Sequence, residues 1–132
     1  MKTVQFTEPA DAQTKLVVMV EIGTLTIRPS SKPEIFVEAT CRHMDVSVAR
    51  QGSTVQVVAE QEEDFLQRIG RFFRKDQPKA DVTIYLPAHC ELQAKTITGS
   101  LDIEGISAPF SARVITGTLS LKEIFGTIYA KT

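Results

Sequence analysis

Apolar and polar residues alternate along most of the chain, as they do in strands that bury one face. The stretch 92–96 (LQAKT) has apolar or small residues at every second position, and 101–104 (LDIE) follows the same rule. Gly99 lies between the two stretches and interrupts the alternation. Because glycine tolerates backbone angles that other residues avoid, it suits a bend or a bulge. The pattern predicts a unit of two short strands with a bend between them.

This unit is repeated along the sequence. Residues 92–109 (LQAKTITGSLDIEGISAP) are followed by 110–127 (FSARVITGTLSLKEIFGT), and a third copy begins at 128–132 (IYAKT). An apolar residue opens each copy, and an alanine follows two positions later. Near the N-terminus, 16–33 (LVVMVEIGTLTIRPSSKP) keeps the same offsets, including the central glycine. One such unit cannot bury its inward face alone, so the repeat predicts units that stack on one another.

Stacking in register would place like residues over like. We expect Leu92, Phe110 and Ile128 to form one inward column, and Leu101 and Leu119 to form another. The predicted fold class is therefore all-β, a short single-domain β-solenoid or β-helix-like repeat. A β-sandwich and a β-roll are the alternatives.

Further strand-like segments lie outside the repeat. Residues 35–40, 45–49, 54–60 and 81–86 are rich in valine or isoleucine and alternate, with a turn predicted at 50–53. These segments do not keep the repeat length. They are expected to form less regular coils, or a hairpin packed on the solenoid.

The segment 62–75 (EEDFLQRIGRFFRK) breaks the β pattern and predicts an inserted amphipathic helix. Acidic residues begin it and basic residues end it, an order that the helix macrodipole favours. The expectation is that its apolar face covers part of the solenoid; the alternative is an exposed face at a membrane surface or nucleic acid. The residues of this segment that we assign to a candidate interaction surface are Phe65, Phe72, Phe73, Arg71 and Arg74.

Three stretches together resemble a known family: DVTIYLP at 81–87, LQAKTITGSLDIEG at 92–105 and VITGTLSL at 114–121. A strand ending in Leu-Pro, followed by Thr-x-x-Gly repeats, is similar to the bacterial β-strand-repeat family of proteins called "putative adhesins", a domain of unknown function. The resemblance implies a β-solenoid-like fold and no established enzyme activity, and it supplies no catalytic residues. The chain departs from the family pattern in its small number of repeats and in the predicted helix.

Length and charge limit the remaining possibilities. A chain of 132 residues fits a single domain, residues 1–132, and a net charge of −1 gives no basic field to hold nucleic acid. The N-terminus lacks the apolar core of a secretory signal, and the longest apolar run, Leu16–Val20, is too short to span a bilayer. A cytoplasmic location is the default expectation, with surface association if a signal peptide has been removed.

Metal chemistry is weakly indicated. Cysteine and histidine fall in two pairs, Cys41 with His43 and His89 with Cys90, which could together form a zinc site. Adjacent residues on a strand point to opposite faces, however, and Cys90 is in phase with the inward Leu92. We expect buried free thiols, no metal and no cofactor.

Catalytic patterns are also missing from the sequence. Neither histidine lies in a Gly-x-Ser-x-Gly motif, and no phosphate-binding loop is present. Asp102 and Glu104 could form a glycosidase pair on an outward strand face, but the next copy replaces them with Ser120 and Lys122. No aromatic residue lies beside them in the sequence to stack on a sugar. The prediction is a protein that is not an enzyme.

The predicted function is a non-enzymatic β-solenoid module for protein interaction, adhesion or self-assembly. The alternatives are a carbohydrate-active β-helix enzyme and a peripheral membrane or cytoskeletal scaffold of the bactofilin type. The third copy stops after its first strand, so we expect an open solenoid edge at Ile128 and Tyr129 through which the chain forms a homodimer or a larger assembly.

Overall fold

The computed structural model describes residues 2–11, 13–61, 78–107, 110–122 and 128–131. Within these ranges the chain forms strands and no helix. The predicted helix at 62–75 lies outside the described residues, together with Phe65, Arg71, Phe72, Phe73 and Arg74. The strands are β1 (Lys2–Pro9), β2 (Lys15–Ser30), β3 (Glu34–Arg42), β4 (Met44–Gln51), β5 (Thr54–Gln61), β6 (Lys79–Pro87), β7 (Glu91–Glu104), β8 (Phe110–Lys122) and β9 (Ile128–Lys131).

The strands form one mixed sheet rather than a solenoid, so the predicted β-solenoid is wrong, whereas the all-β class is confirmed for the described residues. A solenoid would stack sequential parallel coils, but the main strand order here is β1-β3-β6-β2-β7-β8-β9. β3 pairs antiparallel with both β1 and β6, and β4 pairs antiparallel with β5. The connection from β4 to β5 consists of Gly52 and Ser53 alone, which permits only an antiparallel hairpin. The antiparallel pairs formed by segments outside the repeat are therefore what excludes a solenoid.

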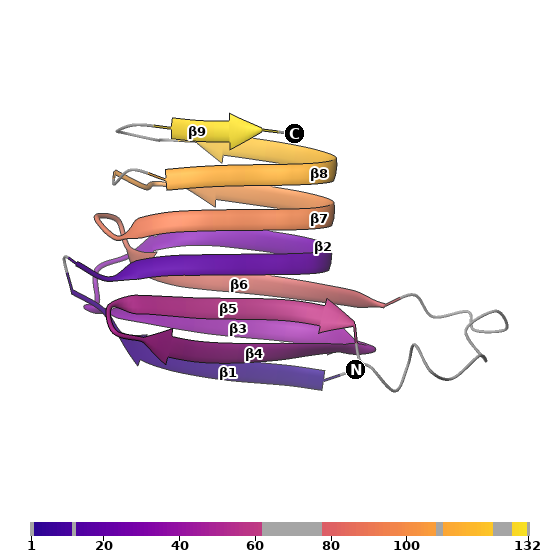
Figure 1. The fold of residues 1–132 in the computed structure, drawn as a ribbon, viewed down its shortest axis with the longest axis horizontal. Coiled ribbons are helices and arrows are strands. Elements are labelled where there is room, and N and C mark those ends of the chain that lie inside the picture. Colours follow the sequence, from indigo (N-terminus) through magenta and orange to yellow (C-terminus); the bar gives the residue numbers. More distant parts are fainter. Residues whose placement is uncertain (1, 12, 62–77, 108–109, 123–127, 132) are drawn as a thin grey trace, which may run out of the picture.

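The sheet has two walls because its three long strands each belong to both. The first half of β2 pairs with β5 and the second half pairs with β6, while β7 follows β2 along both halves. Wall one contains β4, β5, the first halves of β2, β7 and β8, and β9. Wall two contains β1, β3, β6 and the second halves of the long strands. Figure 1 shows these strands turning back at one side, so that the sheet nearly closes into a flattened barrel.

Glycines form the bends between the walls. Gly23, Gly99 and Gly117 are register partners and have φ between +136° and +139°, a region that L-residues avoid. A Cβ on Gly99 would overlap the carbonyl oxygen of Gly23, and one on Gly117 would overlap that of Gly99. The bends therefore stack backbone on backbone, which leaves no room for any side chain. The sequence prediction of a bend at each repeat glycine is confirmed.

The predicted stacking of the repeats is also confirmed, although it occurs within a mixed sheet. Leu92 pairs with Phe110, Phe110 with Ile128, and Leu101 with Leu119. The N-terminal copy joins the same register, since Leu16 pairs with Leu92. Parallel strands with identical offsets place every inward residue above its counterpart.

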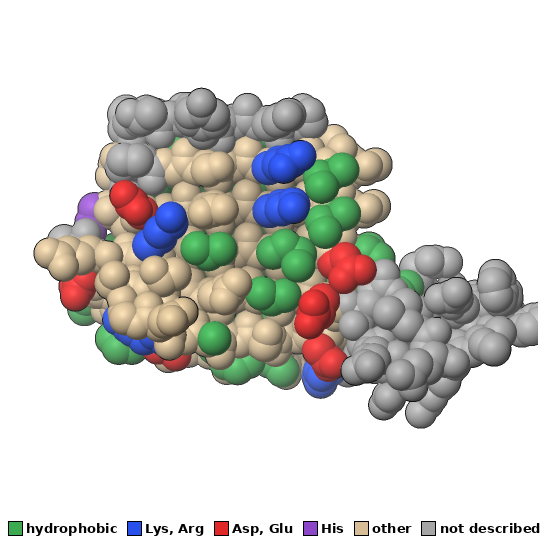
Figure 2. All heavy atoms as spheres, in the orientation of Figure 1, with side chains coloured by type: hydrophobic (Ala, Val, Ile, Leu, Met, Phe, Trp, Pro, Cys, Tyr) green, Lys and Arg blue, Asp and Glu red, His purple; other side chains and the backbone are tan. Residues whose placement is uncertain are grey.

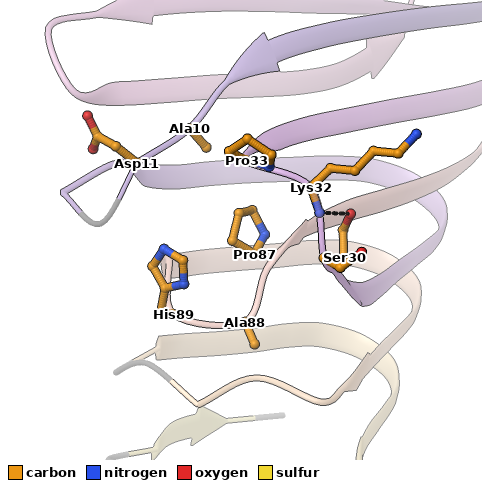
Figure 3. A pocket seen from close by; sticks show the side chains of 9 residues that line it. Ala10, Asp11, Ser30, Lys32, Pro33, Pro87, Ala88 and His89 are labelled. Atoms are coloured by element: carbon orange, nitrogen blue, oxygen red, sulfur yellow. Dashed lines mark hydrogen bonds between the residues drawn. The ribbon is translucent and has the colours of Figure 1, made fainter.

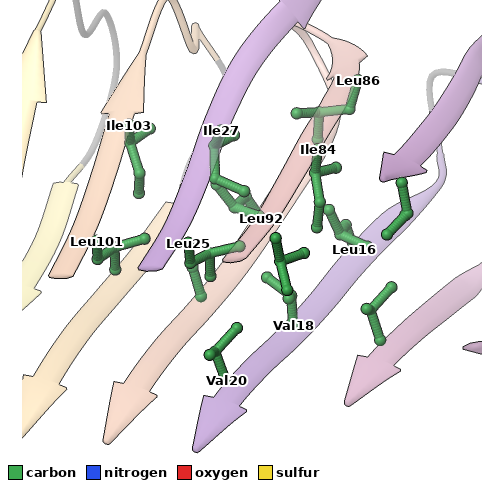
Figure 4. Close-up of a cluster of buried hydrophobic side chains, with 14 of the residues drawn as sticks. Leu16, Val18, Val20, Leu25, Ile27, Ile84, Leu86, Leu92, Leu101 and Ile103 are labelled. Carbon is green, nitrogen blue, oxygen red and sulfur yellow. The ribbon is translucent and has the colours of Figure 1, made fainter. Parts of the chain in front are cut away.

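One core fills the space between the walls, and Figure 4 shows its aliphatic side chains converging from both. Leu25, Ile27 and Leu101 are completely buried. β1 and β4 approach each other at the far end of the barrel, where the Arg50 guanidinium donates to the Pro9 carbonyl oxygen at 2.6 Å and Lys2 lies 3.2 Å from Asp45. These contacts join the two walls opposite the β8–β9 end.

Candidate interaction surfaces

The C-terminal part of the predicted interaction surface lies on β9. Ile128 and Tyr129 occupy the register positions of Phe110 and Ser111 in the neighbouring strand. The structure thus places the start of the third copy in register with the second copy, as the repeat predicts. The helical part of that surface lies outside the described residues.

Wall two ends one strand earlier than wall one, and we refer to this end as the stepped edge. β9 pairs only with Phe110–Arg113, so the second half of β8, from Thr116 to Lys122, has no strand on its outer side among the described residues. Leu119 and Leu121 are half-buried here, whereas their register partners on β7 are fully buried. Unpaired backbone groups and incompletely covered core residues therefore coincide at the stepped edge.

The outer face of wall one carries a separation of charge. Lys95 and Arg113 are register partners, and neither has an ion-pair partner within the described part of the chain. Figure 2 shows basic side chains over the upper strands of this face and acidic side chains gathered at its lower right. Exposed Ile115 lies two residues after Arg113 on the same face.

The outer face of wall two carries a second group of residues, which we call the aromatic–ion row. It runs across four strands and consists of Phe36, Tyr85, Arg28, Asp102 and Glu104. Tyr85 is a register partner of both Phe36 and Arg28, and it is 42% exposed. Tyr85 lies on this face together with Asp102 and Glu104, with β2 between their strands. The sequence gives no sign of this arrangement, because the strand order β6-β2-β7 sets the neighbours.

Arg28 organises this row. Its Nη2 donates to Oδ2 of Asp102 at 3.2 Å, and its Nε lies 3.4 Å from Oε2 of Glu104. Its Nη1 also donates to the Ile27 carbonyl oxygen at 2.9 Å. The guanidinium is thereby held by the two carboxylates and by the backbone of its own strand. Asp102 accepts a hydrogen bond from it, and Glu104 forms an ion pair with it.

A hollow of about 510 Å³ lies at the end of the barrel where the long strands begin and end. The two prolines Pro33 and Pro87 occupy its middle, with His89 and Lys32 on either side, as Figure 3 shows. Ser30 also lines it, and the Ser30 hydroxyl accepts a hydrogen bond from the Lys32 amide at 3.2 Å. We refer to this feature as the end hollow.

Cys41 and Cys90 are buried and are not joined in a disulfide. The Cys90 thiol donates to the Asp11 carbonyl oxygen at 3.7 Å, and burial, followed by the nearby Asp11 carboxylate, raises its pKa. The pKa of Asp11 itself is lowered by the backbone N–H of Gln13 and then by the hydroxyl of Thr14. His89 lies exposed in the turn before Cys90. Across the described ranges, no three residues of the His, Cys, Asp and Glu types cluster in a way that could hold a metal ion.

No helix in the part of the chain that the structure describes has the length and hydropathy needed to cross a bilayer.

Comparison with known proteins gives matches of structure and none of sequence. No family model matches the chain, and no curated protein matches it. A "putative cell adhesion protein" from Clostridium sporogenes matches 98% of each chain at 7% identity, with a TM-score of 0.49. A "putative adhesin" from Parabacteroides merdae matches 91% of this chain and 52% of its own length at 11% identity, with a TM-score of 0.42.

A further "putative adhesin", from Parabacteroides distasonis, matches 93% of this chain and 66% of its own length at 10% identity, with a TM-score of 0.39. These structures carry descriptions of the same kind as the family that the Thr-x-x-Gly pattern resembles.

Proposed function

We propose that this chain is a non-enzymatic interaction module, of the adhesion or assembly kind, that works as a symmetric homodimer formed through the stepped edge. The observation that carries the proposal is the one-strand difference in height between the two walls. Among the described residues, β9 is the last strand of wall one, and the second half of β8, which has no strand on its outer side, is the last strand of wall two. Each molecule therefore presents a protruding strand next to a notch.

A two-fold axis parallel to the strands makes this step self-complementary. Rotation about such an axis places wall one of one protomer in line with wall two of its partner. β9 then enters the notch above the partner's second half of β8, and the partner's β9 enters the other notch. Figure 1 shows that β9 and the second half of β8 run in opposite directions, so both new pairs are antiparallel. An isologous contact of this kind closes on itself and leaves neither step open.

Dimerisation is favourable because it covers the unpaired backbone groups and the half-buried leucines of the stepped edge at the same time. The unpaired N–H and C=O groups of Thr116–Lys122 gain strand partners, as in β-strand addition. The half-buried Leu119 and Leu121 become covered by the partner's core. Lys122, exposed at the end of β8, discourages pairing in other registers.

The two alternative functions have less support. In a glycosidase, two carboxylates act from either side of a bond held between them. Asp102 and Glu104 instead share the single guanidinium of Arg28, and neither lines the end hollow. A polymer-forming scaffold needs a head-to-tail contact, whereas the stepped edge favours a closed one.

Sedimentation velocity at high micromolar concentration tests the proposal. The intact chain is expected to sediment as a dimer. Leu121→Lys, which places a charge in the notch, is expected to sediment as a folded monomer, because a lysine at the free edge can extend to water only in the unpaired state. Ile115→Lys is the matched control on the outer face of wall one, and it should remain dimeric.

Hydrogen exchange provides a second measurement that does not depend on a variant. The amides of Thr116–Lys122 should be protected in the concentrated protein and should lose protection on dilution. A strictly monomeric intact protein with concentration-independent exchange would overturn the proposal. Larger species that grow with concentration would also overturn it, in favour of a head-to-tail polymer.

A further inference from the structure

The aromatic–ion row brings a stacking surface next to fixed hydrogen-bonding groups. The rings of Phe36 and Tyr85 lie with centroids 6.4 Å apart and planes inclined at 39°. Arg28 lies on the next strand beyond Tyr85, held by Asp102 and Glu104. An exposed aromatic ring offers an apolar face and the carboxylates offer acceptors, while the guanidinium adds planar donors. This is the combination needed by a ligand that has both an apolar face and a rim of hydroxyl groups.

The end hollow continues this surface along the same strands. Ser30 follows Arg28 by two residues on β2, Pro87 follows Tyr85 by two residues on β6, and Ser30 and Pro87 are themselves register partners. Residues two apart on a strand share a face. The row and the hollow thus adjoin, and the hollow of about 510 Å³ has the size of a small-ligand site.

The dimensions of the aromatic–ion row suit a ligand made of several linked rings rather than a single ring. Tyr85 on β6 and Asp102 on β7 are separated by β2, which places them two strand spacings apart, or about 10 Å. That span is about the length of a disaccharide, and the end hollow can accept a further unit.

The charges argue against an anionic ligand. In the row, the single positive charge of Arg28 is paired with the two carboxylates of Asp102 and Glu104. The end hollow is lined by one ammonium group, that of Lys32, and one carboxylate, that of Asp11. The surface therefore has no excess of positive charge that could select an anionic ligand.

We infer that the outer face of wall two binds a neutral oligosaccharide, with one sugar ring stacked on Tyr85 and hydroxyl groups bound by Arg28, Asp102 and Glu104. The row thus accommodates two sugars, and a further sugar extends over the Ser30–Pro87 pair into the end hollow. No covalent step is involved. This inference goes beyond the proposed function, because it names a ligand for a face that lies away from the stepped edge.

Affinity electrophoresis in native gels tests it directly. The probes are soluble neutral polysaccharides cast separately into the gel: mannan, galactomannan, xylan, a mixed-linkage β-glucan and dextran. The intact chain is expected to be retarded by at least one of them. Tyr85→Ala should weaken that retardation about tenfold, the loss expected when one aromatic stacking contact is removed.

Two further variants separate binding from folding. Asp102→Asn keeps the shape of the row but weakens the hold on Arg28, and should reduce retardation. Ile115→Ala is the matched control, an exposed apolar residue on the opposite wall that should leave retardation unchanged. Melting temperatures of all variants, measured in parallel, exclude loss by unfolding.

Three outcomes would overturn the inference. One is no retardation of the intact chain by any of the five probes. Another is retardation that Tyr85→Ala and Asp102→Asn leave unchanged. The third is binding only to an acidic polysaccharide such as alginate, abolished by salt, which would indicate an ionic ligand. A chain that is monomeric but still retarded would contradict only the proposed dimer. A chain that is dimeric but not retarded would contradict only this inference.

Discussion

The four strands of the repeat copies, β2, β7, β8 and β9, differ from β1, β3 and β4 in what specifies their neighbours. In the repeat region, every strand lies parallel to its counterpart with identical offsets, and glycine stacks on glycine. In the other region, antiparallel pairs link segments that share no motif, such as β1 with β3. The comparison teaches that a repeated sequence specifies its own pairing, whereas unrepeated alternating segments specify only which face is buried.

The largest expected effect is at the bends of the repeat region. Gly99→Ala should prevent folding or cost more than about 3 kcal/mol, because its Cβ would overlap the backbone of Gly23 at a φ of +137°. Gly52→Ala, in the β4–β5 turn, is the matched control: its φ is +61°, with nothing within 4 Å of the added Cβ. That change should cost only about 1–2 kcal/mol. Chemical denaturation of both variants measures the difference, and equal costs would contradict the close stacking of the bends.

A smaller effect distinguishes the middle of the repeat stack from its end. Leu101→Ala should lower the free energy of unfolding by about 2–5 kcal/mol, because Leu101 is completely buried. Leu119→Ala, in half-buried surroundings at the stepped edge, should cost only about 1–2 kcal/mol in the monomer. If the chain dimerises as proposed, the cost of Leu119→Ala should rise with protein concentration. A larger cost at Leu119 than at Leu101 in dilute solution would mean that the inward face is misassigned.

The smallest effect is a gain in stability. The Thr96 hydroxyl is buried and has no hydrogen-bond partner among the described residues, and its register partners in the stack are Val20 and Val114. Thr96→Val should therefore stabilise the protein by about 1 kcal/mol, raising Tm by about 3–5 °C. Thr98→Val, at an exposed position on the same strand, is the control and should change little. A lower Tm for Thr96→Val would show that the hydroxyl contributes a stabilising contact.

Some candidate features could be predicted from the sequence and others could not. The position of β9 follows from the repeat, because the third copy pairs in register with the one before it. The aromatic–ion row could not be found in this way, since Tyr85, Arg28 and Asp102 become neighbours only through the order β6-β2-β7. The spacing of these residues along the sequence does not indicate the order of the strands in the sheet.

The sequence by itself determined which face of each strand is buried, where the long strands bend and how the repeat copies align. Alternation and glycine placement are local properties, and a repeated motif aligns with itself because any other register would place its glycines and inward residues out of step. Only the tertiary structure decided that the sheet is mixed, that β6 lies between β3 and β2, and that wall two ends one strand below wall one. Backbone hydrogen bonds are the same for every sequence, so they do not select a partner for an unrepeated strand. Which strands pair there depends on how the whole core is enclosed.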